Sequence, residues 1–178
     1  MNSIMPALLA ATLETLAMVG VSVSVCVAFG LTLGAGLAIS SPQGIAPSRV
    51  HQLLAAFANV SRSIPFLVLM VLLVPFTRFL VGTSIGTAAA IIPLVVGWTP
   101  YAARLVEAAL LDVDTGLIQA VVTLGASPAQ AVWKVYLPEA IPGLIRAFTV
   151  LAITMINFSA MAGVVGGGGL DDLAIRYG

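Results

Sequence analysis

The feature that most constrains this chain is a run of 24 residues, 16–39, without one charged side chain. As an α-helix rising about 1.5 Å per residue, the run is longer than the roughly 30 Å hydrocarbon core of a bilayer. Charged residues make up 8% of the chain and apolar residues 60%, whereas soluble domains carry about 25% charged residues. The run therefore predicts a transmembrane helix, and the composition argues against a soluble enzyme or a disordered linker.

Three further uncharged stretches predict three more spans. They cover residues 63–77, 79–103 and 147–170. The first of them is short, but Arg62 and Arg78 at its ends can extend toward the lipid headgroups, and the helix can also begin near Leu53 with Pro65 as a kink. The expected fold is an all-α, polytopic transmembrane helical bundle with four spans in this chain.

Basic residues set the expected orientation, because they collect on the cytoplasmic side of membrane proteins. If residues 40–62 and 104–146 share one side, that side carries five basic residues and the other side carries two. The five are Arg49, Arg62, Arg104, Lys134 and Arg146, and the two are Arg78 and Arg176. We therefore expect the 104–146 section in the cytoplasm and the N-terminus outside. The net charge of zero gives no electrostatic footprint for nucleic acid.

The section at 112–142 has the pattern of a capped helical hairpin. Its residues supply an N-cap and a terminal glycine for a first helix, then a capping box and a closing proline for a second. The N-cap of the first helix is Asp114 or Thr115, and its terminal glycine is Gly125. The capping box of the second helix is formed by Ser127 and Gln130, and its closing proline is Pro138. An amphipathic hairpin suits docking into a groove of a partner protein. Helices lying on the membrane surface are the less favoured alternative, because residues 112–138 contain Lys134 as their one basic residue.

The spacing within this hairpin resembles the EAA loop of ABC importer permeases. The family pattern is Glu-Ala-Ala, three residues, Gly, nine residues, Ile, one residue and Leu-Pro. The chain matches this spacing, with Gln119 in place of Glu, Val121 in place of the second Ala, and Val135 in place of Ile. The resemblance implies a coupling loop that docks into a cytoplasmic ATPase, with any charged contact weakened at Gln119. The coupling residues it implies are Gln119, Ala120, Val121, Gly125, Ala126, Val135, Leu137 and Pro138.

Segments along the whole chain are similar to the permeases of bacterial methionine importers within that family. They include Arg62-Ser63-Ile64-Pro65-Phe66, Gly82-Thr83-Ser84-Ile85-Gly86 and Leu137-Pro138-Glu139-Ala140-Ile141-Pro142. The resemblance implies a type I ABC permease subunit in the bacterial inner membrane that forms, as a homodimer, the methionine pathway. Its partners would be two copies of an ABC ATPase, which carry the ATP and magnesium, and an extracytoplasmic substrate-binding lipoprotein. This chain would bind no cofactor itself.

The same resemblance implies a single domain, and it leaves alternative functions open. Permeases of this family carry a fifth transmembrane helix, so we interpret residues 1–178 as a single, C-terminally truncated permease domain. A permease for another amino acid or small solute is the first alternative. A membrane scaffold or channel without an ATPase is less favoured, and an intramembrane enzyme least.

Candidate pathway and gate residues lie in the third and fourth spans. Asn157, Phe158, Ser159 and Met161 place polar and polarizable groups in an otherwise aliphatic helix, which predicts a substrate pathway. Packing is the competing interpretation, with Phe158 and Met161 able to share a helix face. Arg104 and Glu107 are three residues apart and can form an ion pair, either structural or part of an inward gate.

No catalytic or metal-binding constellation is expected. His51 stands alone in the sequence and is interpreted as a loop histidine without a role. The four glycines at 166–169 lack the Gly-Lys-Ser/Thr ending of a phosphate-binding loop and are expected to form an external turn. Any ATP-driven step must therefore be performed by a partner.

Overall fold

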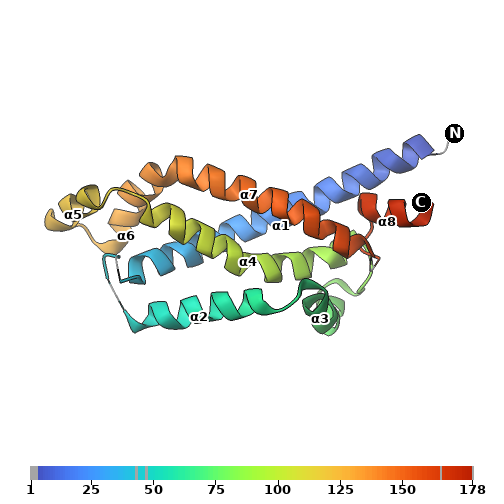
Figure 1. Cartoon of the computed structure of the whole chain (residues 1–178), viewed down its shortest axis with the longest axis horizontal. Helices are drawn as coiled ribbons and strands as arrows, with labels where there is room; N and C mark the ends of the chain where they lie inside the picture. Colours follow the sequence, from blue (N-terminus) through green and yellow to red (C-terminus); the bar gives the residue numbers. More distant parts are fainter. Residues whose placement is uncertain (1–3, 43, 47, 165, 178) are drawn as a thin grey trace. The chain divides into compact units, whose positions relative to one another are not determined.

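The structure is a computed structural model that describes residues 4–42, 44–46, 48–164 and 166–177. Every regular element in these residues is a helix, so the expected all-α membrane fold is confirmed. In chain order they are α1 (Ile4–Ser40), α2 (Arg49–Ser63), α3 (Phe66–Val81), α4 (Thr87–Leu111), α5 (Thr115–Thr123), α6 (Pro128–Ala131), the π-helix η1 (Val132–Tyr136), α7 (Leu137–Val164) and α8 (Gly169–Tyr177) (Figure 1).

The membrane spans correspond to long apolar helices. Three segments are long and apolar enough to cross a bilayer, namely Met5–Ser40, Thr87–Leu111 and Pro128–Gly163. The pair His51–Ser63 and Phe66–Val81 passes the same test only when counted together, and it is bent by 102°. Pro65 lies at this bend with ψ of 133°, an extended conformation that interrupts the helix where a kink was expected.

The limits of the later spans differ from the expected ones. The uncharged stretch at 79–103 is not one helix, because α3 ends at Val81 and Gly82 caps it in the left-handed region with φ of 81°. The next helix, α4, begins at Thr87 and continues to Leu111. It passes through Arg104 and Glu107, whose side chains pair with each other.

The fourth span begins earlier than expected, and Pro138 does not stop the hairpin's second helix. The segment Pro128–Gly163 is one continuous helical stretch that contains α6, η1 and α7. Within η1 the N–H of Leu137 donates to the carbonyl of Val132, five residues earlier. The wider π turn accommodates the proline ring, which in a regular α-helix would clash with a carbonyl four residues before it.

Two compact units make up the chain. The first comprises residues 1–26, 64–98 and 151–178, and the second comprises residues 27–63 and 99–150. The long helices α1, α4 and α7 contribute to both. Buried apolar residues define a core in each unit: Met18, Phe66, Ala90, Leu94 and Ala162 in the first, and Ala38, Val106, Leu110, Val113, Ile118, Val132, Tyr136, Ala140 and Leu144 in the second.

Small residues bring α1 and α4 close together in the second unit. A Cβ atom added at Gly30 would lie 2.7 Å from the Cβ of Ala102, and one added at Gly34 would lie 2.6 Å from the carbonyl oxygen of Ala103. Side chains larger than hydrogen therefore do not fit at either glycine. This is the small-residue packing that lets membrane helices approach closely.

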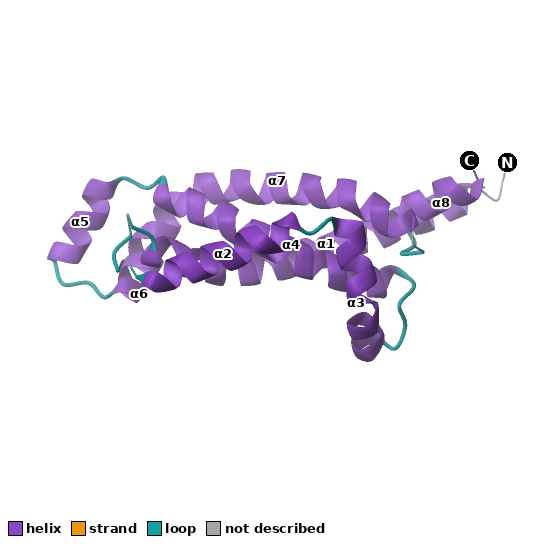
Figure 2. Ribbon diagram, turned by 60° about the horizontal axis from the view of Figure 1, so that its bottom comes forward, coloured by secondary structure: helices purple, strands orange, loops and turns teal. Residues whose placement is uncertain are grey.

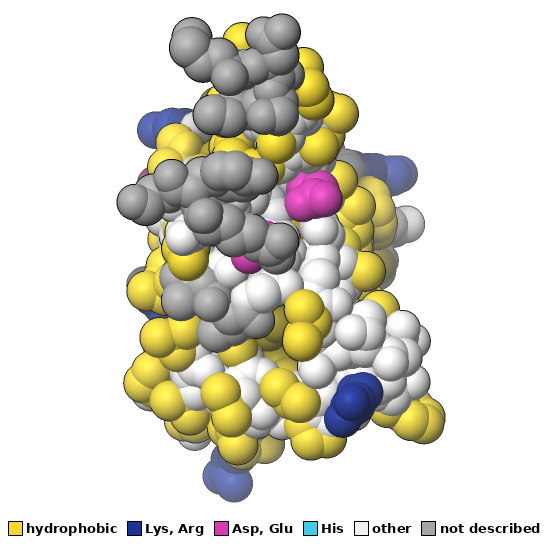
Figure 3. Space-filling model, turned by 90° about the vertical axis from the view of Figure 1, so that its right-hand side faces the viewer, with side chains coloured by type: hydrophobic (Ala, Val, Ile, Leu, Met, Phe, Trp, Pro, Cys, Tyr) yellow, Lys and Arg dark blue, Asp and Glu magenta, His cyan; other side chains and the backbone are white. Residues whose placement is uncertain are grey.

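Large apolar side chains cover much of the surface. Leu13, Val71, Phe79 and Ile153 are among the exposed ones, and Phe79 is 86% exposed. In the space-filling view, apolar side chains predominate and charged ones are few (Figure 3). A soluble protein rarely exposes such extensive apolar area, whereas a bilayer solvates it.

Candidate functional site

The hairpin predicted from its caps is present, beginning with α5. The Asp114 carboxylate accepts a hydrogen bond from the N–H of Gly116 at 2.6 Å, as an N-cap does. At the other end Gly125 has φ of +84°. The N–H groups of Gly125 and Ala126 donate to carbonyls three and five residues earlier, at 2.9 and 3.2 Å. These bonds form a Schellman motif, so Gly125 ends the helix as expected.

The second arm begins with the predicted capping box. The backbone N–H of Ser127 donates to the side-chain oxygen of Gln130 at 2.9 Å, and the N–H of Gln130 donates to the Ser127 hydroxyl at 3.3 Å. Pro128 occupies the first helical position, where its missing N–H costs no hydrogen bond. Loops on either side set α5 apart from its neighbours, while the second arm continues into α7 (Figure 2).

One buried side chain anchors α5 to the second unit. Ile118 is 9% exposed and belongs to the same core cluster as Val132 and Tyr136 of η1. Val113, which precedes the helix, belongs to this cluster as well. The hairpin is therefore fixed to the helical core through a small apolar contact, and most of α5 is accessible to a partner.

The eight predicted coupling residues fall into two groups. The accessible ones are Gln119, Ala120, Gly125 and Pro138, and the partly buried ones are Val121, Ala126, Val135 and Leu137. Val135 and Leu137 pack against the core of the second unit. The motif therefore combines residues on the hairpin surface with residues that hold η1 and α7 in place.

Sequence reasoning did not select the most exposed apolar side chains of the hairpin as site residues. Leu124 is 85% exposed, Trp133 is 74% exposed and Leu117 is 46% exposed. Leu117 and Leu124 lie outside the candidate spans, and exposed apolar residues in such positions are typical of protein interaction surfaces. A signal in the sequence could have found such residues. The helix α5 has nine residues, several of them apolar, and of these Ile118 is buried.

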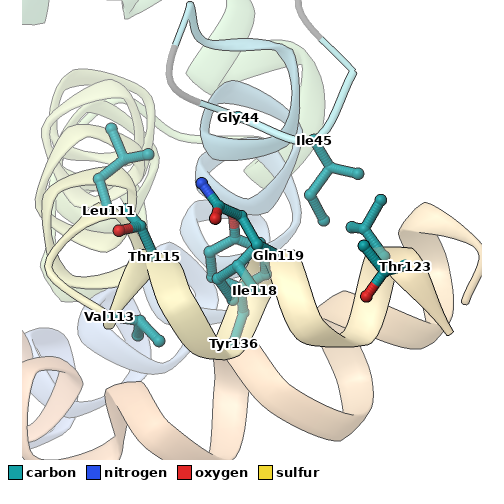
Figure 4. A pocket seen from close by; sticks show the side chains of 10 residues that line it. Gly44, Ile45, Leu111, Val113, Thr115, Ile118, Gln119, Thr123 and Tyr136 are labelled. Carbon is teal, nitrogen blue, oxygen red and sulfur yellow. The ribbon is translucent and has the colours of Figure 1, made fainter.

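A cavity of about 500 Å³ lies beside α5 (Figure 4). Its wall is formed by α5, the loop after α1, the end of α4 and η1. The lining residues are Gly44, Ile45, Leu111, Val113, Thr115, Ile118, Gln119, Val122, Thr123 and Tyr136. Gln119, which replaces the family's Glu, thus faces a cavity of its own chain as well as the surface.

The predicted ion pair forms and includes a third residue. Glu107 is 5% exposed, and its Oε2 accepts a hydrogen bond from Arg104. Its Oε1 lies 3.8 Å from Nδ1 of His51. The expected loop position of His51 is wrong, because His51 lies in α2, where its Nδ1 is also 3.2 Å from the carbonyl oxygen of Leu37. The pair was predictable from its spacing, whereas His51 comes from a distant part of the sequence.

The predicted pathway residues do not share one environment. Phe158 packs among aromatic rings, with its centroid 4.5 Å from Trp98 and 5.5 Å from Phe66. Ser159 is 1% exposed and donates to the carbonyl of Ile156 at 2.7 Å. Asn157 and Met161 are instead exposed. Phe158 and Met161 therefore do not line a common surface, despite their spacing of three residues.

The glycine-rich segment forms a turn, as expected for its described residues. Gly166 and Gly168 have φ of 88° and 75°. The turn is held by α1, a contact that sequence reasoning missed because it joins residues 155 positions apart. Glu14 Oε2 accepts a hydrogen bond from the N–H of Gly169 at 2.9 Å, and Thr15 Oγ1 accepts one from the N–H of Leu170 at 3.0 Å. Side chains of α1 thereby cap the first turn of α8.

These features define a multi-pass helical membrane protein with an anchored, accessible hairpin. Residues 27–177 match the family model described as "Binding-protein-dependent transport system inner membrane component". The chain belongs to this family of transport permeases. Its localisation in a bacterial inner membrane follows from that membership and from the apolar helices.

Two relatives have similar sequences over most of the chain. The probable D-methionine transport system permease protein MetI of Vibrio cholerae is 49% identical over 172 residues, which are 96% of this chain and 76% of that protein. The D-methionine transport system permease protein MetI of Escherichia coli K12 is 50% identical over 151 residues, which are 84% of this chain and 70% of that protein.

Solved structures agree with the family assignment. The chain matches an inward-facing crystal structure of the MetNI methionine ABC transporter with a TM-score of 0.96 and 47% identity, covering 100% of this chain and 83% of that one. It also matches an amino acid ABC transporter crystallised with histidines, with a TM-score of 0.77 and 26% identity over 98% of this chain and 79% of that one.

Proposed function

We propose that this chain is the permease subunit of an ATP-driven methionine importer and that its α5–α6 hairpin couples it to a separate ATPase. The observation that carries the proposal is the hairpin itself, which is capped at both arms, anchored by Ile118 and exposes Leu124 and Trp133. The relatives named as D-methionine permeases support methionine as the substrate.

In this proposal two copies of the chain form the pathway, and each hairpin docks one cytoplasmic ATPase. ATP binding draws the two ATPases together and moves the hairpins. Because the second arm continues through η1 into α7, the movement passes directly to a spanning helix. The pathway then alternates between two states open to opposite sides. The chain performs no covalent chemistry, since ATP and magnesium are bound and ATP is hydrolysed on the partner.

The remaining predicted residues take roles consistent with their positions. Residues 112–142 act as the cytoplasmic coupling loop of a single permease domain, with the N-terminus outside, as the excess of basic residues on the hairpin side indicates. A substrate-binding lipoprotein delivers methionine on the outer side. Asn157 and Met161 face the pathway, Phe158 and Ser159 hold α7 in position, and Arg104 with Glu107 contributes to the inward gate.

The test is reconstitution in proteoliposomes with the ATPase and the binding protein. Leu124→Asp places a charge on the most exposed apolar position of the hairpin and should abolish ATPase co-purification and radiolabelled methionine uptake. Phe79→Ala removes an equally exposed apolar side chain from α3, and this control for lost apolar surface should retain the ATPase. Full ATPase binding and uptake in the Leu124→Asp variant would overturn the coupling role.

Another amino acid is the second candidate substrate. The structural match to an amino acid ABC transporter shows that the same fold occurs in a transporter described with histidines. Competition of unlabelled amino acids against methionine uptake separates the two. Methionine should compete best, and stronger competition by histidine would reassign the substrate while leaving the ATPase-coupling hairpin unaffected.

A further inference from the structure

A second cavity, separate from the one beside α5, opens where α1 ends and α2 begins. Its volume is about 310 Å³, and it is lined by Ser40, Pro42, Ser48, Arg49, His51 and Gln52. Five of these six side chains can form hydrogen bonds, which is unusual in a chain that is 60% apolar. A cavity with such side chains at the end of a spanning helix lies where lipid headgroups are found.

The charge of this cavity is positive. Arg49 is exposed, and among the described residues no carboxylate lies within salt-bridge distance of it. The one buried carboxylate nearby, Glu107, is already engaged by Arg104 and lies against the far side of His51. A guanidinium without an acidic partner favours an anionic ligand, and its fork geometry matches phosphate as well as carboxylate.

The histidine of the cavity is held in a fixed orientation. Nδ1 of His51 lies 3.2 Å from the carbonyl oxygen of Leu37, and that atom is also the one nearest to Glu107. The ring nitrogen available to a ligand is therefore Nε2. Through these contacts α1 and α4 fix the first turn of α2, so the cavity wall is positioned before any ligand binds.

Apolar side chains continue from the cavity along α2. Leu53, Phe57 and Val60 are 73%, 66% and 65% exposed. They follow Arg49 by four, eight and eleven residues, so all four side chains lie on one face of the helix. The face thus has a cationic residue at its start and an apolar surface after it, which matches the headgroup and acyl chain of one lipid molecule.

We propose that the cavity at the start of α2 binds the phosphate-bearing headgroup of an anionic lipid, with an acyl chain lying along Leu53, Phe57 and Val60. Arg49 neutralises the phosphate, and Ser48, His51 and Gln52 provide hydrogen bonds around it. The apolar face distinguishes a lipid from free phosphate, because phosphate alone would use only the cavity. The site does not depend on the identity of the transported solute.

The test measures lipid binding to the whole chain, purified and delipidated in detergent, by native mass spectrometry. The probes are dioctanoyl phosphatidylglycerol, dioctanoyl phosphatidylcholine and inorganic phosphate. Phosphatidylglycerol should bind at least about tenfold more tightly than phosphatidylcholine, and Arg49→Gln should remove that preference. Arg49→Lys, which retains the charge, should keep most of it. Arg78→Gln alters another exposed arginine, in the last turn of α3, and should have no effect.

The apolar part of the site is tested separately. The double variant Leu53→Ser and Phe57→Ser should weaken phosphatidylglycerol binding by about tenfold or more, with circular dichroism confirming an unchanged helix content. Equal affinity for the two lipids, or an Arg49→Gln variant that keeps the preference, would overturn the proposal. Full competition by inorganic phosphate at the lipid's own concentration would assign the cavity to a soluble anion and overturn the lipid assignment.

Discussion

Replacing Gly34 with alanine should force α1 away from α4 and destabilise the second unit. A Cβ at this position would lie 2.6 Å from the carbonyl oxygen of Ala103 and 2.6 Å from the Cβ of Val106. Non-bonded carbon atoms pack best at about 3.5–4.0 Å, so the overlap is roughly 1 Å. A backbone carbonyl cannot rotate out of the way. Overpacking of this kind costs about 1–3 kcal/mol of unfolding free energy, partly offset by the higher helix propensity of alanine.

Gly36 provides a matched control on the same helix. A Cβ added there meets nothing within 4 Å, so Gly36→Ala should retain or slightly raise the stability. Both variants are heated in detergent micelles as fluorescent fusions, and the fraction that stays monodisperse is measured by size-exclusion chromatography. For a chain of this size, Gly34→Ala should lower the midpoint by roughly 2–12 °C. Equal midpoints for the two variants would refute the close approach of α1 and α4.

Three further variants test contacts described above. Glu107→Ala leaves Arg104 without its carboxylate partner and should lower the unfolding free energy by about 1–3 kcal/mol. The same thermal assay measures this as a lower midpoint, and an unchanged midpoint would contradict a structural ion pair. Thr15→Val removes the acceptor for the Leu170 N–H and should speed hydrogen exchange in the first turn of α8 while leaving α4 unchanged. Gly125→Ala introduces a Cβ at φ of +84° and should destabilise the hairpin by about 1 kcal/mol. Proteolysis between α5 and α6 should therefore be faster, and a proteolysis rate equal to that of the parent protein would argue against the left-handed turn.

The capping preferences of residues close together in the sequence were sufficient to predict how the hairpin helices begin and how the first one ends. Asp114, Gly125 and the pair Ser127 and Gln130 all take the roles that their residue types and spacing predict. Each of these interactions joins residues within five positions of one another, so the sequence pattern contains all the information needed. The existence of the apolar spans was predictable for the same reason, because hydrophobic length is a local property.

Helix limits and distant contacts were not predictable in this way. Pro138 is a strong stop signal in an α-helix, but the π turn before it changes the hydrogen-bonding register and removes the clash. The helix α4 continues to Leu111, past the end of the uncharged stretch at Ala103, and includes the paired Arg104 and Glu107. The contact of His51 with Glu107 joins helices far apart in the sequence, and no local pattern marks it.

The capping of α8 by α1 has a consequence for the order in which the molecule is made. Glu14 and Thr15 are synthesised 155 residues before their respective partners, Gly169 and Leu170. The Glu14 carboxylate therefore lacks its backbone donor until the start of α8 has been synthesised. This contact joins two helices that are distant in the sequence, so it can close only after α1 to α7 have been made, and its loss should slow folding more than it disturbs any single helix.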